Sequence, residues 1–179
     1  ARFVDRWKPT DEKSVKAKSR IVVLGFKDPH VLQLERSAPT PTAEGFTTML
    51  QVMASLQFEA VSSDLKNAFG QAMPTNRRQP LCASIPPGML ESGFDLDPRQ
   101  LLLMETEVYG LISGPSWLRQ SLMSYFLSLG YVRNPYEKCA LTLPPVRTAT
   151  EDKHGLTADI GGKGTFNEGV VLIEVDDIL

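Results

Sequence analysis

Two segments with helical periodicity are interleaved irregularly with short apolar runs, and this order constrains the fold more than any other feature. Apolar side chains recur at helical spacing in residues 42–56 and again in residues 115–129. Short runs typical of buried strands lie around these segments, at residues 20–26, 58–63, 101–104 and 169–175. Because helices and strands follow one another without regular alternation, the pattern predicts a fold of the α+β class.

Local signals mark the ends of the two predicted helices. Thr42 can cap the first helix with its hydroxyl group, and Pro115 suits the first position of the second helix. Gly130 suits the residue after the end of that helix. The three prolines of residues 28–41 predict a loop, and the polar, glycine-rich residues 144–168 predict a flexible insertion.

Composition favours a folded, soluble and intracellular protein. Of the 179 residues, 42% are hydrophobic, which is enough for one domain with a core. No apolar run reaches the length of a membrane span, and no basic segment precedes an apolar one at the start. The two cysteines, Cys82 and Cys139, match no metal or redox spacing, so we expect free thiols in a reducing compartment.

The charge is distributed unevenly along the chain. Residues 1–36 hold nine Lys/Arg against five Asp/Glu, whereas the remainder holds ten against sixteen. A basic beginning beside an acidic remainder suits a protein that holds phosphates with one part and metal ions with the other. Ordinary solvated surface would give the same counts, and charge alone favours that plainer interpretation.

Three aspartates are the strongest chemical signal. Asp176 and Asp177 directly follow an apolar run, and adjacent carboxylates repel unless a cation such as Mg²⁺ lies between them. Asp64 also follows a predicted strand, and carboxylates at the ends of neighbouring strands can build a two-metal site for phosphoryl transfer. The alternatives are a turn for the pair and a helix cap for Asp64.

Six short motifs, in order, resemble the reverse transcriptases of copia-type retrotransposons. Residues 64–69 (DLKNAF) resemble the first catalytic motif of that family, and residues 175–179 (VDDIL) resemble its "YVDDIL". The remaining similarities are to "KARLVARGFKQ", "QPPGF", "LYGLKQSPRAW" and "LxxLGF", at residues 16–27, 85–88, 108–117 and 127–131. Together the motifs extend from about residue 13 to the last residue.

The resemblance implies a right-hand polymerase fold with fingers and a ferredoxin-like palm, truncated after the aspartate pair. Residues 1–57 would be fingers-like. Residues 58–179 would form the palm, with an inserted fingers segment at about 70–105 and the flexible insertion at 144–168. The implied activity is RNA-directed DNA polymerisation, in which a nucleotidyl group is transferred to a primer 3′-hydroxyl. The implied partners are a template-primer, a deoxynucleoside triphosphate and the rest of a Pol polyprotein, with integrase upstream and RNase H downstream.

The resemblance also assigns roles to single residues. Asp64, Asp176 and Asp177 would be catalytic and would bind two Mg²⁺ ions, or Mn²⁺ in their place. Lys18 and Arg20 would meet the triphosphate of the incoming nucleotide, Phe69 would lie under its sugar, and Tyr109 with Gly110 would line the pocket. Each has a plainer alternative: surface charge for the two cations, a core aromatic for Phe69 and a tight loop for Tyr109 and Gly110.

Departures from the family pattern keep two other interpretations open. Glu174 stands where the family has an aromatic residue, and the sequence ends two residues after Asp177. We therefore expect this chain by itself not to polymerise DNA. The alternatives are a catalytically inactive, truncated or decayed retrotransposon fragment with weak nucleic-acid binding, and a metal-dependent nuclease using similar carboxylates.

Overall fold

The computed structural model describes residues 1–9, 14–91, 93, 95–144 and 169–174. This described part combines helices with small sheets and forms two compact units. The first unit contains Ala1–Ala38 and Asp64–Leu122, and the second contains Pro39–Ser63 and the described residues from Met123 to Glu174. Neither unit is continuous in sequence, and the predicted division at residues 57 and 58 into fingers and palm remains a prediction.

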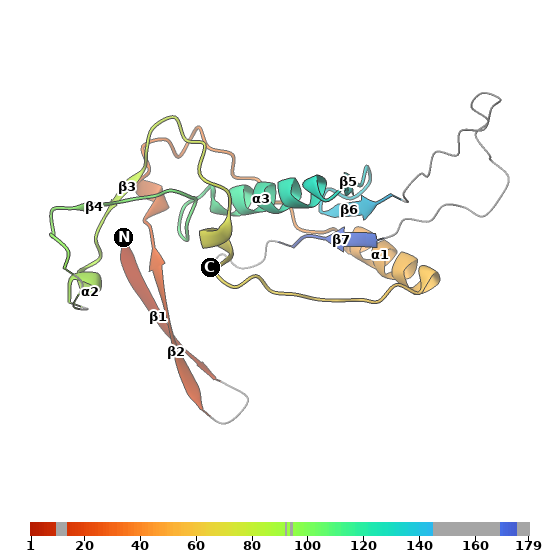
Figure 1. Ribbon diagram of the computed structural model, residues 1–179, viewed down its shortest axis with the longest axis horizontal. Helices are drawn as coiled ribbons and strands as arrows, with labels where there is room; N and C mark the ends of the chain where they lie inside the picture. Colours follow the sequence, from red (N-terminus) through yellow and green to blue (C-terminus); the bar gives the residue numbers. More distant parts are fainter. Residues whose placement is uncertain (10–13, 92, 94, 145–168, 175–179) are drawn as a thin grey trace. The chain divides into compact units, whose positions relative to one another are not determined.

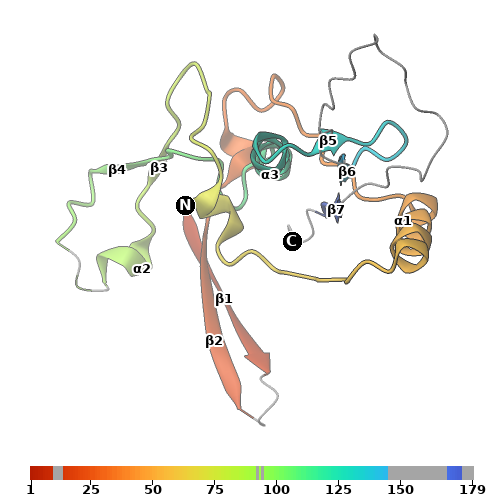
Figure 2. The same cartoon turned by 45° about the vertical axis from the view of Figure 1, so that its right-hand side comes forward.

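A long two-stranded ribbon begins the first unit (Figure 1). Strands β1 (Arg2–Pro9) and β2 (Val15–Val22) pair antiparallel, with Trp7 opposite Ala17 and Arg6 opposite Lys18. Figure 2 shows the two strands crossing, as the twist of a two-stranded ribbon requires. The strand predicted at 20–26 is therefore wrong in its bounds and its burial. Strand β2 begins earlier and is mostly exposed, because a ribbon has no second sheet to cover it.

The two faces of this ribbon differ in chemistry. Side chains alternate between faces, so the even-numbered residues share one face and the odd-numbered residues share the other. The even face gathers six cations and no carboxylate: Arg2, Arg6, Lys8, Lys16, Lys18 and Arg20. We call it the basic face. The odd face includes the exposed apolar side chains of Phe3, Trp7, Val15 and Ile21.

The rest of the first unit is built from short elements around a small core. Strands β3 (Cys82–Ser84) and β4 (Leu101–Leu103) pair antiparallel, and the short helix α2 (Pro87–Leu90) follows β3. Two 3₁₀ turns, η1 (Gly25–Lys27) and η2 (Ala68–Gln71), also belong to this unit. Val23, Ala83 and Leu111 form the core cluster, so the end of β2, strand β3 and the loop before the next helix meet there.

Helix α3 (Gly114–Ser128) begins next to Pro115, as that proline predicted, and its first residues belong to the first unit. The Trp117 indole nitrogen donates a 2.8 Å hydrogen bond to the Met73 carbonyl and fixes the first turns of the helix. After the helix, Gly130 has a φ of 92° and the Tyr131 amide donates to the Phe126 carbonyl. Gly130 thus acts as the left-handed residue that ends the helix, which confirms its predicted role.

The second unit packs one helix beside a three-stranded antiparallel sheet. Strands β5 (Val132–Arg133), β6 (Ala140–Leu143) and β7 (Gly169–Leu172) lie in that order, and β6 contributes the buried Ala140 and Leu141. Helix α1 (Ala43–Leu56) contacts β7. Thr42 caps α1 through its hydroxyl group, which accepts a 2.9 Å hydrogen bond from the Gly45 amide, as the sequence predicted.

Two further expectations have clear outcomes. Residues 58–63 form no strand, and Val61 is 81% exposed. None of the strands in the described part of the chain pairs with this segment, and an extended chain forms a sheet only where its backbone groups find partners. Apart from Pro144, the predicted insertion at 144–168 lies outside the described residues. Among the residues that the structure describes, no helix is long and apolar enough to cross a membrane.

Candidate nucleotide site

The predicted metal site is only partly within the described chain. Asp64 is exposed and precedes a turn, but no strand leads into it, so its predicted strand-end position is wrong. Asp176 and Asp177 lie outside the described residues. Within the described ranges, no three His, Cys, Asp or Glu side chains are grouped so that they could hold a metal ion. The two-metal site therefore remains a prediction.

Three of the predicted nucleotide-binding residues meet in the first unit. The ring of Phe69 lies 4.5 Å from the ring of Tyr109, measured between centroids, with the planes tilted by 56°. The guanidinium carbon of Arg20 lies 5.1 Å from the Tyr109 centroid, within the range of a cation–π contact. Arg20 comes from β2, Phe69 from η2 and Tyr109 from the loop before α3. We call this arrangement the Tyr109 stack.

The backbone holds the Tyr109 loop against the end of β2. The Val23 amide donates to the Tyr109 carbonyl at 2.8 Å, and the Gly25 amide donates to the Gly110 carbonyl at 3.1 Å. Gly110 has a φ of 91°, and a Cβ on it would lie 2.0 Å from the Val23 carbonyl oxygen. A Cβ on Gly25 would lie 2.2 Å from the Gly110 oxygen. Neither position has room for a side chain, so both glycines are needed for this close approach.

Lys18 lies on the same face of β2 as Arg20 but two residues further along the ribbon. It is exposed and belongs to the basic face. That spacing corresponds to about 6.6 Å along a strand, which leaves Lys18 outside the Tyr109 stack. The structure therefore brings Arg20, Phe69, Tyr109 and Gly110 together, and places Lys18 on the adjoining surface.

The burial of Phe69 differs from expectation. The spacing from Asp64 predicts that this ring packs beside the carboxylate cluster and outside the deep core. Instead Phe69 is only 4% exposed. Tyr109 covers one part of the ring, and the missing side chain of Gly114 lets it approach the start of α3. In this conformation Phe69 supports Tyr109, and its ring has little surface left for a nucleotide sugar.

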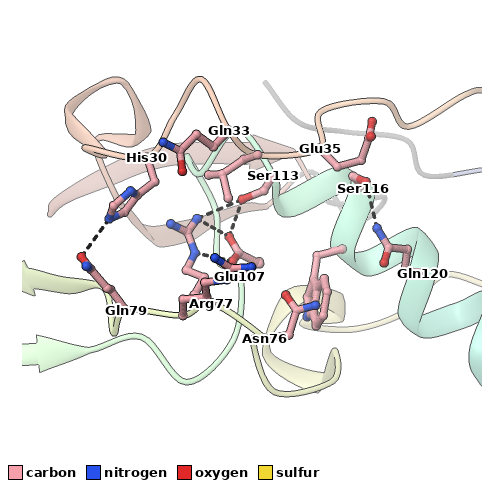
Figure 3. Close-up of a pocket in the computed structure, with 13 residues that line it drawn as sticks. His30, Gln33, Glu35, Asn76, Arg77, Gln79, Glu107, Ser113, Ser116 and Gln120 are labelled. Carbon is pink, nitrogen blue, oxygen red and sulfur yellow. Dashed lines mark hydrogen bonds and ion pairs between the residues drawn. The ribbon is translucent and has the colours of Figure 1, made fainter.

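A buried ion-pair network involves residues on both sides of Tyr109 in the sequence, and Figure 3 shows its Arg77, Glu107 and Ser113. Arg77 donates from Nε and Nη2 to the two carboxylate oxygens of Glu107, at 2.6 and 2.9 Å. Its Nη1 donates to Asp28 at 2.5 Å, and its Nη2 also reaches the Ser113 hydroxyl at 3.0 Å. The side chains of Arg77, Asp28 and Glu107 are 7%, 3% and 4% exposed. We call this set, together with Ser113, the Arg77 cluster.

The cluster shifts the protonation equilibria of its members. Burial raises the pKa of the Glu107 carboxyl, but hydrogen bonds from Arg77, Ser113 and Thr75 outweigh it, so the net pKa is below its ordinary value. The hydrogen bond to Glu107 raises the pKa of Arg77, despite its burial. A lowered carboxyl pKa stabilises the fold above the unfolded pKa, and this contribution is lost as pH falls through the folded pKa.

A cavity of about 750 Å³ opens beside the Arg77 cluster. Most of the residues that line it have polar side chains, and those drawn in Figure 3 include His30, Gln33, Asn76, Gln79, Ser116 and Gln120. The His30 ring nitrogen Nε2 lies 3.0 Å from the Gln79 side-chain oxygen across part of this wall. Sequence reasoning missed both cavity and cluster. The cluster residues follow no period and match no motif, and only the closeness of Glu107 and Ser113 to Tyr109 hinted at them.

Comparisons with family models, curated proteins and solved structures found no match to the chain.

Proposed function

We propose that this chain is a fingers-and-palm part of an RNA-directed DNA polymerase of the copia retrotransposon type, and that the Tyr109 stack binds the incoming deoxynucleoside triphosphate. The family assignment rests on the order of the sequence motifs. The observation that supports the binding role is the convergence of Arg20, Phe69, Tyr109 and Gly110. Three separate motifs supplied these residues, and they meet at one place.

The chemistry of the stack suits a nucleotide. Arg20 is partly exposed and carries a permanent charge whose planar donors match phosphate oxygens. Tyr109 is also partly exposed, and an aromatic ring beside a cation can support a base or sugar. In the proposed reaction Asp64, Asp176 and Asp177 would hold Mg²⁺, which stabilises the attacking and leaving oxygens of the transfer.

The basic face of the ribbon supports a nucleic-acid partner. Four of its cations, Lys18, Arg6, Lys16 and Lys8, continue from Arg20 away from the stack, and no carboxylate shares the face with them. Phosphate backbones are bound mainly through such cations, and this binding weakens steeply with salt. A template-primer on the basic face would therefore lie next to a nucleotide at the Tyr109 stack.

Nucleotide binding is the first test. A fluorescent deoxynucleoside triphosphate with Mg²⁺ is titrated into the chain and into Arg20→Ala and Tyr109→Ala, with Arg99→Ala as the control. Arg99 is exposed and pairs with the nearby Asp97. Losing a charge-assisted hydrogen bond weakens binding by roughly tenfold or more, so Arg20→Ala should do so and Arg99→Ala should not. Equal affinity in all four proteins would contradict the proposal.

Primer extension separates the enzyme from its alternative, an inactive retrotransposon fragment. A primed RNA template, Mg²⁺ or Mn²⁺ and the four deoxynucleotides are supplied to the chain and to the Asp176→Asn, Asp177→Asn double variant. Extension that the double variant lacks supports the polymerase. Nucleotide binding without extension by either protein supports the inactive fragment.

A further inference from the structure

We infer that Arg77 is a positioning residue that holds the Tyr109 loop in its nucleotide-binding geometry. The inference rests on the proposed function of the Tyr109 stack, and it assigns a role to a residue whose side-chain hydrogen bonds go to Asp28, Glu107 and Ser113, not to Tyr109 or Arg20. Its evidence is the way in which one guanidinium joins three segments of the first unit.

The first set of Arg77 hydrogen bonds goes to the two ends of the Tyr109 loop. Glu107 precedes Tyr109 by two residues, and Ser113 follows Gly110 by three. Arg77 binds both Glu107 oxygens and the Ser113 hydroxyl, and the Ser113 hydroxyl donates a 2.5 Å hydrogen bond to Glu107. The loop is therefore closed at its base by side chains: Ser113 bonds directly to Glu107, and Arg77 bonds to both.

The second Arg77 contact is with Asp28, in the segment against which the Tyr109 loop lies. Asp28 accepts from Arg77 Nη1, and the Asp28 amide donates to the Gly25 carbonyl at 3.1 Å. The Gly25 amide in turn donates to the Gly110 carbonyl. Arg77 thus fixes both the loop and its neighbour, and the alignment of Arg20 over Tyr109 depends on their relative position.

The geometry requires arginine and not simply a positive charge. Arg77 donates from Nε, Nη1 and Nη2 in one plane to acceptors on residues 28, 107 and 113. A lysine ammonium is a single point on a flexible stem and cannot span these acceptors with fixed directions. The segment that carries Arg77 is anchored too. The Thr75 amide donates to the Glu105 carbonyl at 2.7 Å, and the Thr75 hydroxyl donates to Glu107.

The experiment compares Arg77→Lys, Ser113→Ala and Asp28→Asn with the parent and with Arg78→Lys. Arg78 lines the cavity, but it is exposed and lies outside the cluster, so it controls for the same chemical change. Two quantities are measured at a temperature where every protein is folded. One is deoxynucleotide affinity, and the other is hydrogen exchange at the amides of Val23 and Gly25, which donate to the Tyr109 loop.

We expect Arg77→Lys to weaken nucleotide binding about tenfold, as for a lost charge-assisted contact, and to speed exchange at Val23 and Gly25. Exchange at Met104, whose amide bonds to Leu81 in the β3–β4 region, should stay unchanged. Ser113→Ala and Asp28→Asn should act in the same direction and more weakly, which covers the case in which Arg77→Lys does not fold.

Two results would overturn the inference. Uniformly faster exchange, including Met104, would mean that Arg77 only stabilises the unit as a whole. Unchanged exchange and affinity in all three variants would mean that the loop does not depend on the cluster. If the parent binds no nucleotide, the proposed function fails, and the exchange pattern alone still decides whether Arg77 positions the loop.

Discussion

Gly110 shows how strongly a single position can be fixed by its surroundings. Replacing it by alanine combines an unfavourable positive φ with a Cβ only 2.0 Å from the Val23 carbonyl oxygen. We predict that Gly110→Ala lowers the free energy of unfolding by about 3 kcal/mol or more in urea titrations. Gly93 has a φ of 83° with no atom within 4 Å of the same Cβ position, so Gly93→Ala should cost only about 1 kcal/mol. Equal losses would contradict the close approach.

Glu137 gives the second unit a predicted response to acid. Hydrogen bonds from the Thr42 hydroxyl, and then from the Cys139 amide, lower the pKa of the Glu137 carboxyl. Its stabilising contribution is therefore complete above the unfolded pKa, about 4.3, and is lost as pH falls through the lower folded value. We predict that Glu137→Gln weakens the acid dependence of α1 unfolding, measured by circular dichroism. Glu44→Gln removes an exposed charge from the same helix, and an equal effect from it would contradict the assignment.

At the scale of elements, the ribbon offers a test in which the test variant and its control lose the same net charge. Changing Arg6, Lys8 and Lys16 to glutamine should weaken nucleic-acid binding. It should also reduce the slope of log affinity against log salt by roughly 2 to 3, because each lost phosphate contact removes about 0.7 to 0.9. The control also replaces three cations by glutamine, namely Arg78, Arg99 and Arg133, which are exposed and lie outside the ribbon. Equal losses of affinity in both triple variants would mean that the chain binds by net charge alone.

The sequence predicted the elements whose signals are local. Helix α1 with its Thr42 cap, helix α3 with Gly130 after it, and strand β4 all lie where periodicity and capping residues indicated. The strand at 58–63 failed because an apolar run does not reveal whether a partner strand exists. The ribbon was misjudged for a related reason: the run at 20–26 is apolar, yet β2 ends at Val22 and the chain then turns at Gly25.

The candidate site was predictable to a similar extent. Motif resemblance selected Arg20, Phe69, Tyr109 and Gly110, and the fold brings these four together. It could not indicate that Phe69 is covered, because coverage depends on Gly114 and on the tilt of Tyr109. The Arg77 cluster was out of reach, since its members come from three unrelated segments and only the folded chain places them together.

At the scale of the whole molecule, each compact unit carries one cysteine as a natural probe. Cys82 is exposed on β3, whereas Cys139 is fully buried in the second unit and donates to the Pro39 carbonyl. We predict that a thiol reagent modifies one cysteine quickly, and the other only at the rate at which the second unit opens. In the Cys82→Ser variant, only the slow reaction of Cys139 should remain. Two equally fast thiols would contradict the burial of Cys139.

The Arg77 cluster also has a consequence for the chain as it leaves the ribosome. Asp28 precedes Arg77 by 49 residues, and Glu107 follows Arg77 by 30 more. At about 5 to 20 residues per second, roughly 4 to 16 s pass between the synthesis of the first carboxylate and that of the second. The ribbon needs only local pairing and can form in that interval, with Trp7 and Val15 uncovered. The same side chains are still exposed in the folded first unit, so a nascent chain of this protein presents this apolar face to cellular chaperones during those seconds, and closure of the Arg77 cluster does not cover it.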